Sequence, residues 1–336
     1  MAELDLNGFN KGVPFDNKNN PLNPAVRSDH AAIYGVLSYN DSTQTIIGCI
    51  NISNKDYHAN FGLGPTPPFI NTHMYVPEES ADISKKIWLD TKTNEQLDDI
   101  IYDLKEKVID IQVVVEGSYD FFSKLRERLN CNGNNFAIIS ILNNNSQAYK
   151  NKPWNVTGII VNNSKFKVID YNIIQQDYSE EHGTIIHKPR TLIVPYVRVM
   201  DLISKRCLIV LGVHIPGCIS NFPRGGLEQL SAIIKQLRRK YTDDIVAIGD
   251  FNTCPNNIKQ AMKEVNIAPV PYPTHINPNS EIAVYDNVVY VFNTKDAQSI
   301  EIAGTSALND DSKAIVSSMI NNFMAAKRLT SKYTTA

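Results

Sequence analysis

The chain has 336 residues, of which 43% are hydrophobic and 20% are charged, enough for one large α/β domain or two ordinary ones. The formal net charge is −2, so bulk charge does not indicate tight, nonspecific nucleic-acid binding, although a local basic groove would suffice for it. The five cysteines are scattered without a Cys-x-x-Cys pair, which argues against a disulfide framework and against a zinc site.

No apolar run reaches the roughly 18 residues that cross a bilayer, so we expect no transmembrane segment. The N-terminus is polar and acidic and lacks an ordinary secretory signal. The sequence therefore predicts a cytoplasmic protein, or one that is exported without such a signal.

The N-terminal quarter of the chain alternates between irregular and strand-like segments. Residues 1–27 are rich in Asn, Pro and Gly and predict an extended arm or loop. The apolar part of 27–37 and residues 44–52 predict two strands, which a turn at 40–42 joins into an antiparallel hairpin. Residues 54–93 are irregular, and a loop of that length is usually functional or an insertion.

Periodicity predicts the remaining elements. Apolar residues recur at helical spacing in four segments, at 94–107, 121–129, 227–240 and 311–328. Short apolar runs predict strands at 108–115, 136–142, 156–161, 166–170, 191–199, 208–213, 245–248 and 284–292. No internal repeat or clean linker divides the chain, so we expect a single domain over 28–300 and a C-terminal helical extension over 301–336.

A carboxylate and a carboxamide follow the apolar run at 245–248. Ligands in α/β folds are usually handled at the carboxyl ends of strands. Alternation along a strand predicts that Asp250 and Asn252 point to one side and Phe251 to the other. The carboxylate can take a proton from water or bind a hard metal, and the carboxamide can orient the same water or a phosphate oxygen.

Four other strand-like segments contain or end on polar side chains, those of Asn51, Glu116, His214 and Asp286. Each has an ordinary explanation by itself, as a turn or edge residue, a helix cap, a half-buried histidine or a ladder-edge charge. Together they favour a shared site, because buried strands rarely tolerate so many polar residues. Oxygen ligands of these types suit Mg²⁺ or Mn²⁺, and a metal with a base and an opposed acid suits hydrolysis of a phosphate ester.

In this order, the motifs resemble those of the endonuclease/exonuclease/phosphatase superfamily, the DNase I-like proteins. The resemblance covers roughly residues 45–292 and rests most on the Gly-Asp-Phe-Asn sequence at 249–252, since the other motifs are weak singly. It implies an α/β fold, a four-layer αββα sandwich of two mostly antiparallel sheets flanked by helices. It also implies a metal-dependent hydrolase that acts on phosphate ester bonds.

The sequence departs from the family at its last motif, a Ser-Asp-His triplet that normally follows the strand of Asp286. The corresponding segment, 308–314, contains no histidine, whereas Ser28-Asp29-His30 precedes the first predicted strand. Since the first and last strands of the family fold are neighbours, a circular permutation that moves the last strand to the N-terminus would restore the site. The alternative is a chance triplet in a capping turn and a decayed motif at 308–314.

The resemblance implies a role for each matching residue. Asn51, Glu116 and Asp29 are expected around Mg²⁺ or Mn²⁺. Asp250 is expected to orient or deprotonate the attacking water, and Asn252 to hold phosphate or metal.

The remaining expected roles are at the phosphate. The permutation predicts that His30 lies within hydrogen-bond reach of Asp286, with Asp29 near Glu116, so that His30 faces the phosphoryl group. His214 is expected to make a second phosphate contact. Arg190 is either a further phosphate contact or a solvated charge at the start of a strand.

Three functions remain open from sequence. The first is a Mg²⁺-dependent phosphodiesterase or nuclease, with a phosphate-ester substrate that could be nucleic acid. The second is a phosphatase of inositol phosphates or phospholipid headgroups, for which the apolar residues of 57–77 form either a rim or an ordinary packed loop. The third is a catalytically silent binding protein on the same fold. The oligomeric state and the role of the C-terminal helix are not predicted.

Overall fold

The computed structural model of the chain describes residues 30, 32–52, 94, 96–98, 100–105, 109–131, 135–141, 156–179, 181–182, 185–186, 190–217, 222–270, 274–276, 282–295 and 297–302. The predicted arm at 1–27, Asp29, the loop at 54–93 and the predicted helix at 311–328 lie outside these residues. No helix in the described part of the chain is long and apolar enough to cross a membrane.

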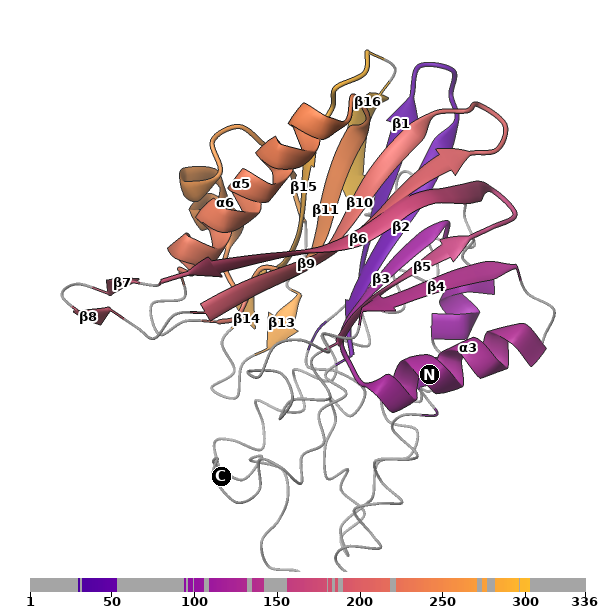
Figure 1. Ribbon diagram of the computed structural model, residues 1–336, viewed down its shortest axis with the longest axis horizontal. Coiled ribbons are helices and arrows are strands. Elements are labelled where there is room, and N and C mark those ends of the chain that lie inside the picture. The colour runs from indigo at the N-terminus through magenta and orange to yellow at the C-terminus, as the bar shows by residue number, and fades with distance from the viewer. Residues whose placement is uncertain are drawn as a thin grey trace, which may run out of the picture.

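Two six-stranded sheets form the centre of the molecule (Figure 1). The first has the order β16 (Ala297–Ile302), β1 (Ile33–Tyr39), β2 (Gln44–Asn51), β3 (Ile111–Gly117), β5 (Val156–Asn162), β4 (Phe136–Ile141). The second has the order β12 (Asn266–Ala268), β15 (Asp286–Val291), β11 (Asp244–Asp250), β10 (Cys207–His214), β9 (Arg190–Asp201), β6 (Phe166–Tyr178). The pairs β2–β3 and β10–β11 are parallel and the other pairs within these sheets are antiparallel. Two small hairpins pair β7 (Glu181–His182) with β8 (Ile185–Ile186) and β13 (His275–Ile276) with β14 (Ile282–Ala283).

Helices cover the outer faces of both sheets, which makes four layers. α5 (Arg224–Lys240) and α6 (Pro255–Ala261) lie on the second sheet, and α3 (Tyr119–Cys131) and a helix that includes residues 100–105 lie on the first (Figure 1). One apolar cluster lies under the helices of each sheet, and a third fills the space between the sheets. The four-layer sandwich of two mostly antiparallel sheets is therefore confirmed.

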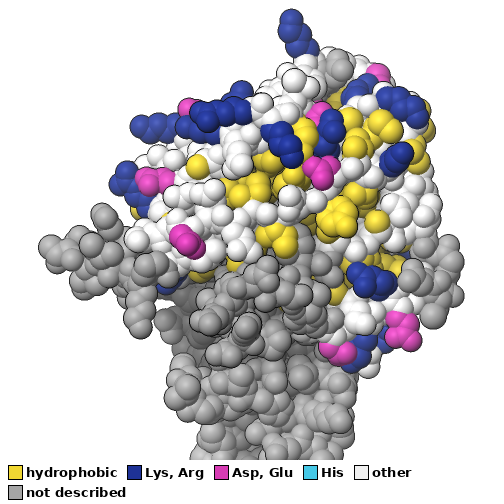
Figure 2. All heavy atoms as spheres, in the orientation of Figure 1, with side chains coloured by type: hydrophobic (Ala, Val, Ile, Leu, Met, Phe, Trp, Pro, Cys, Tyr) yellow, Lys and Arg dark blue, Asp and Glu magenta, His cyan; other side chains and the backbone are white. Residues whose placement is uncertain are grey.

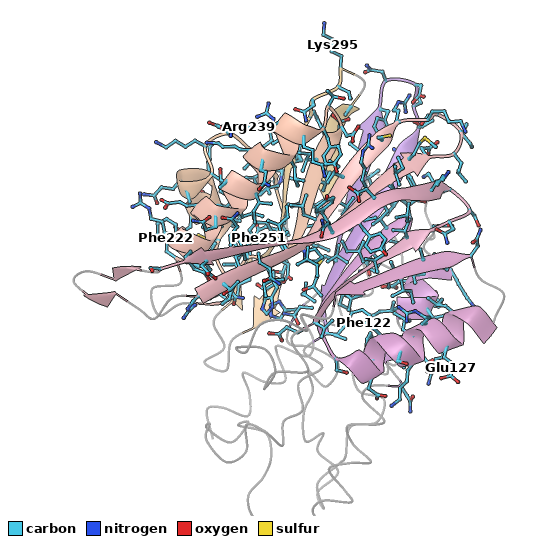
Figure 3. The ribbon with its side chains drawn as sticks, viewed as in Figure 1. Phe122, Glu127, Phe222, Arg239, Phe251 and Lys295 are labelled. Carbon is cyan, nitrogen blue, oxygen red and sulfur yellow. The ribbon has the colours of Figure 1, made fainter. Side chains whose placement is uncertain are left out.

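The central strand β11 explains why the buried runs lack a strict alternation in sequence. Ile245 and Ala247 pack on the helix side, while Val246 and Ile248 pack between the sheets. Because both faces are buried, every position from Ile245 to Ile248 is apolar. The same alternation continues to Phe251, which is buried on the helix side (Figure 3).

The predicted N-terminal hairpin is confirmed. β1 pairs antiparallel with β2, and Ile33 lies opposite Cys49. β1 also pairs with β16 on its other side, a strand that was not predicted and that includes Glu301 and Ile302, two residues assigned to the C-terminal extension. Within the described part of the chain, Cys49, Cys207 and Cys254 are free thiols.

Candidate active site

The polar residues of four strands meet at one end of the sandwich. In the second sheet, His214 lies opposite Asp250 across the parallel β10–β11 pair, and Asp250 lies opposite Asp286 across the antiparallel β11–β15 pair. In the first sheet, Asn51 ends β2 beside β3, and its Nδ2 donates a hydrogen bond to Asp250 Oδ2 at 3.1 Å. Both sheets therefore contribute side chains to one buried cluster.

His30 joins this cluster from the N-terminal side of β1. Its Nδ1 lies 2.7 Å from Asp286 Oδ2, and since a carboxylate only accepts, the ring nitrogen donates. Its Nε2 lies 3.7 Å from Asp250 Oδ2, and the side chain is 6% exposed. The contact between His30 and Asp286, which the permuted arrangement predicts, is thus present between residues 256 positions apart.

Asp250 is the electrostatic centre of the site. Burial raises the pKa of its carboxyl from the ordinary 3.8 to about 7, the nearby His30 lowers it, and the charges of Asp286 and Glu116 raise it. The backbone N–H of Asn252 donates to Asp250 Oδ1 at 2.8 Å and lowers the same pKa. The net effect is that like charges and lack of water outweigh the hydrogen bonds to the ionised form.

Glu116 reaches the site because the strand is irregular there. The pairing of β3 with β5 shifts register between Val114 and Gly117, and Glu116 has a φ of 56°. A bulge of this kind turns a side chain away from strict alternation and is common beside active sites. His214 Nε2 lies 3.5 Å from Glu116 Oε1.

The strand expected to carry both Asp250 and Asn252 is shorter than the sequence predicts. β11 ends at Asp250, and Asn252 has a φ of 49° in the turn that follows. Asparagine tolerates this left-handed conformation better than most residues. Its Nδ2 donates to the backbone oxygen of Ile215 at 2.8 Å, which links the turn to the end of β10.

Arg190 begins β9 close to the same loop. Its Nη1 donates to the backbone oxygens of Gly217 at 2.8 Å and Pro216 at 3.3 Å. The guanidinium group therefore links the start of β9 to the segment after His214.

The predicted metal ligands are only partly described, because Asp29 lies outside the described residues. Among the described His, Cys, Asp and Glu residues, a group of three has ligand atoms within 4.8 Å of one another: His30, Asp250 and Asp286. The chemistry of the cluster fits a divalent cation, because buried carboxylates repel one another and Asp286 Oδ1 has no hydrogen-bond partner.

Two residues of the cluster's surroundings were not identified from sequence. Thr274 and Asn287 are both 0% exposed and hydrogen-bond to the backbone around Asp286. Asn287 carried a signal, since it is a polar residue inside an apolar strand. Thr274 carried none, because it lies in a proline-rich stretch without periodicity.

No protein-family model and no curated protein sequence matches this chain. The chain is similar to solved structures of the human Nocturnin catalytic domain with bound sulfate (14% identity, 59% of this chain and 74% of that one, TM-score 0.44) and of an endonuclease/exonuclease/phosphatase family protein from Bacteroides thetaiotaomicron (13%, 59% and 74%, 0.45). It is also similar to a mannosyl-6-phosphatase from Bacteroides thetaiotaomicron (12% identity, 59% of this chain and 77% of that one, TM-score 0.43). At these identities and TM-scores, the likenesses carry no argument about the family or the chemistry of this chain.

Proposed function

We propose that this chain is a divalent-metal-dependent phosphoesterase of the endonuclease/exonuclease/phosphatase superfamily. The observation that supports it most is the buried contact of His30 with Asp286, beside Asp250. A histidine held by one carboxylate and facing a second is an arrangement suited to proton transfer and phosphate recognition.

Asp250 is proposed as the base. A carboxyl group with a pKa of about 7 can accept a proton from water near neutral pH, and this matching of pKa to pH makes a base effective. Water then attacks phosphorus, and the bond from phosphorus to the leaving oxygen breaks. Asn252, fixed by its bond to Ile215, is proposed to orient that water or a phosphate oxygen.

His30 and His214 are proposed to contact the phosphoryl group. Asp286 engages His30 Nδ1, and Nε2 lies on the side of the ring that faces Asp250, from which His30 is proposed to contact a phosphoryl oxygen. His214 lies on the neighbouring strand beside Glu116. Arg190 is proposed as a residue that supports the 215–217 loop, from which it can also approach a phosphate.

Glu116, Asn51 and Asp29 are the proposed ligands of Mg²⁺ or Mn²⁺, and Asp250 borders the same space. When bound, the ion supplies positive charge that neutralises phosphate oxygens and the developing charge on the leaving oxygen. The charges of Asp286 and Glu116 raise the pKa of Asp250, which supports such an ion, because a cation relieves the repulsion among the three carboxylates.

We also propose that the chain is circularly permuted, with the family's last strand at the N-terminus. Two observations support this reading: β1 lies between β2 and β16 in the first sheet, and His30 immediately precedes β1. Under this proposal, the 308–314 segment is not part of the active site.

The test is an assay of the wild type, Asp250→Ala and His30→Ala with Mg²⁺ or Mn²⁺. The substrates are plasmid DNA, RNA, inositol phosphates, a phospholipid with a phosphorylated headgroup and an aryl phosphodiester. Asp170→Ala is a matched control, because Asp170 bonds Tyr241 and Tyr196 on the outer face of the second sheet. We expect hydrolysis by the wild type and the control, and loss in both site variants. Equal rates in all four proteins, or no hydrolysis of any substrate, would contradict the proposal.

A further inference from the structure

The backbone that leads into β15 is held by side chains. β15 begins at Asp286, so Val284 and Tyr285 precede the strand ladder. Buried backbone N–H and C=O groups need hydrogen-bond partners, and those of this segment must come from elsewhere.

Thr274 provides the acceptor for two backbone donors. Its Oγ1 accepts the N–H of Tyr285 and the N–H of Asp286, each at 2.9 Å. Because its side chain is fully buried, no water competes for these bonds. The hydroxyl therefore fixes the backbone of Asp286 directly.

Asn287 provides donors to the carbonyl groups of the same segment. Its Nδ2 lies 3.0 Å from the oxygen of Tyr285 and 3.4 Å from that of Val284. The same nitrogen donates to the oxygen of Thr253 at 3.2 Å, in the turn that follows Asp250. The N–H of Phe251 adds a bond to the oxygen of Tyr285 at 2.8 Å. Asn287 thus joins the segment before Asp286 to the turn after Asp250.

The cost of Asn287 indicates that its donors matter. Its Oδ1 is buried without a hydrogen-bond partner, and an unpaired buried acceptor is unfavourable. An apolar side chain at this position would avoid that cost, but it would leave the carbonyl of Thr253 without the Asn287 donor.

The orientation of Asp286 depends on this support. Its Oδ2 bonds His30, whereas its Oδ1 has no partner. With only one oxygen held, the direction of the carboxylate is set chiefly by the backbone that carries it.

We propose that Thr274 and Asn287 are positioning residues, which together hold Asp286 in the orientation that directs His30 toward Asp250. This inference rests on the proposed phosphoesterase function for its kinetic consequence, but the hydrogen bonds can be tested without activity.

The kinetic test compares Thr274→Val, which removes the hydroxyl at nearly constant shape, with Thr274→Ser, which keeps it. Loss of a group that orients a site residue typically lowers activity by about 10- to 100-fold. We expect that fall in kcat for Thr274→Val with KM within about threefold of wild type, and near-wild-type values for Thr274→Ser. Equal kcat values for the two variants would overturn the proposal, because the hydroxyl would then have no role.

The second test is hydrogen exchange of the Tyr285 and Asp286 amides. We expect about tenfold faster exchange in Thr274→Val than in Thr274→Ser. Thr45→Val is the matched control: it removes another buried threonine hydroxyl, at the opposite end of the first sheet, and should leave both amides unchanged. Unchanged exchange of the Tyr285 and Asp286 amides in Thr274→Val would overturn the positioning role of Thr274. Faster exchange of these amides in Thr274→Val, together with a wild type that hydrolyses no substrate, would sustain the positioning role and reject the proposed function.

Asn287→Leu keeps the proposal testable if Thr274→Val does not fold. We expect it to lower kcat about tenfold with little change in KM, and to speed exchange of the Phe251 amide. Wild-type kcat and exchange in a folded Asn287→Leu protein would overturn the role of Asn287.

Discussion

The strand β11 carries an aspartate at each end, and the two differ in their partners. Asp244 starts the strand and accepts three hydrogen bonds from the turn after β15: its Oδ1 accepts the N–H groups of Asn293 and Thr294, and its Oδ2 accepts the hydroxyl of Thr294. Asp250 ends the strand among Asp286, Glu116 and His30, where burial and then like charges raise its pKa. The same residue type is thus satisfied at one end and electrostatically strained at the other.

The contrast extends to the neighbouring strands. At the Asp244 end, Arg198 pairs with Asp243, Lys165 with Asp110, and Arg206 with Asp41. Figure 2 shows Lys and Arg side chains along this rim, where Figure 3 labels Lys295. Each of these carboxylates pairs with a basic side chain. Asp250 accepts hydrogen bonds from Asn51 and Asn252. It also faces the carboxylates of Asp286 and Glu116, and perturbed groups of this kind are common at functional sites.

The largest expected effect is at Asp250. Asp250→Asn removes the proposed base, and we expect kcat/KM to fall by about 10²- to 10⁴-fold. Thermal unfolding should show equal or greater stability, because a repelled buried charge is lost. A stable variant with wild-type kcat/KM would contradict the role of Asp250.

The matched change at the other end of β11 should do the reverse. Asp244→Asn replaces an acceptor oxygen by a donor and disrupts the bonds to residues 293–294, at a cost of about 1–3 kcal/mol in the free energy of unfolding. Denaturant titration measures that loss, and kcat/KM should stay within about threefold of wild type. An unchanged free energy of unfolding in Asp244→Asn would show that the hydrogen bonds of Asp244 do not stabilise the fold, and would contradict the contrast between the two ends of β11.

Divalent metal should distinguish the two ends next. Mg²⁺ that binds the folded site raises the free energy of unfolding by about 1.4 kcal/mol at ten times its Kd. Thermal unfolding with Mg²⁺ and with chelator should show this shift in the wild type and in Asp244→Asn. Glu116→Gln should reduce it, and an unreduced shift would remove Glu116 from the metal site.

The smallest effect is expected at the pair of Lys165 and Asp110. Burial raises the pKa of the Asp110 carboxyl above 3.8, and Lys165 lowers it. Since the folded state holds this proton to higher pH than the unfolded chain, stability falls as pH rises from about 4 through the folded pKa. Lys165→Met raises that pKa further, so we expect a loss of roughly 1 kcal/mol at pH 7 and less at pH 4. A loss that does not change with pH would contradict the linkage.

Sequence predicts the parts of this molecule in which local pattern and tertiary environment agree. The apolar runs of β10 and β11, the helical spacing in α5 and the hairpin of β1 and β2 each report burial directly. The contact of His30 with Asp286 can also be predicted from sequence, because the order of the motifs indicates that the two ends of the domain meet.

The remaining features depend on interactions that leave little local signal. The bulge that turns Glu116 and the left-handed turn at Asn252 are set by pairing and by hydrogen bonds to other strands. β6 extends to Tyr178 as an edge strand whose exposed residues, such as Tyr171, need not follow an apolar alternation. Thr274 acts through its hydroxyl on a backbone 11 residues away.

The central claim is that His30, from the N-terminal side of β1, acts with Asp250 at one site. Its most direct test is kcat/KM of His30→Ala on the best substrate with saturating Mg²⁺, beside the wild type. The proposed roles predict a fall of about 10²- to 10⁴-fold in a protein that unfolds cooperatively. A folded His30→Ala protein with kcat/KM within threefold of wild type would contradict the claim.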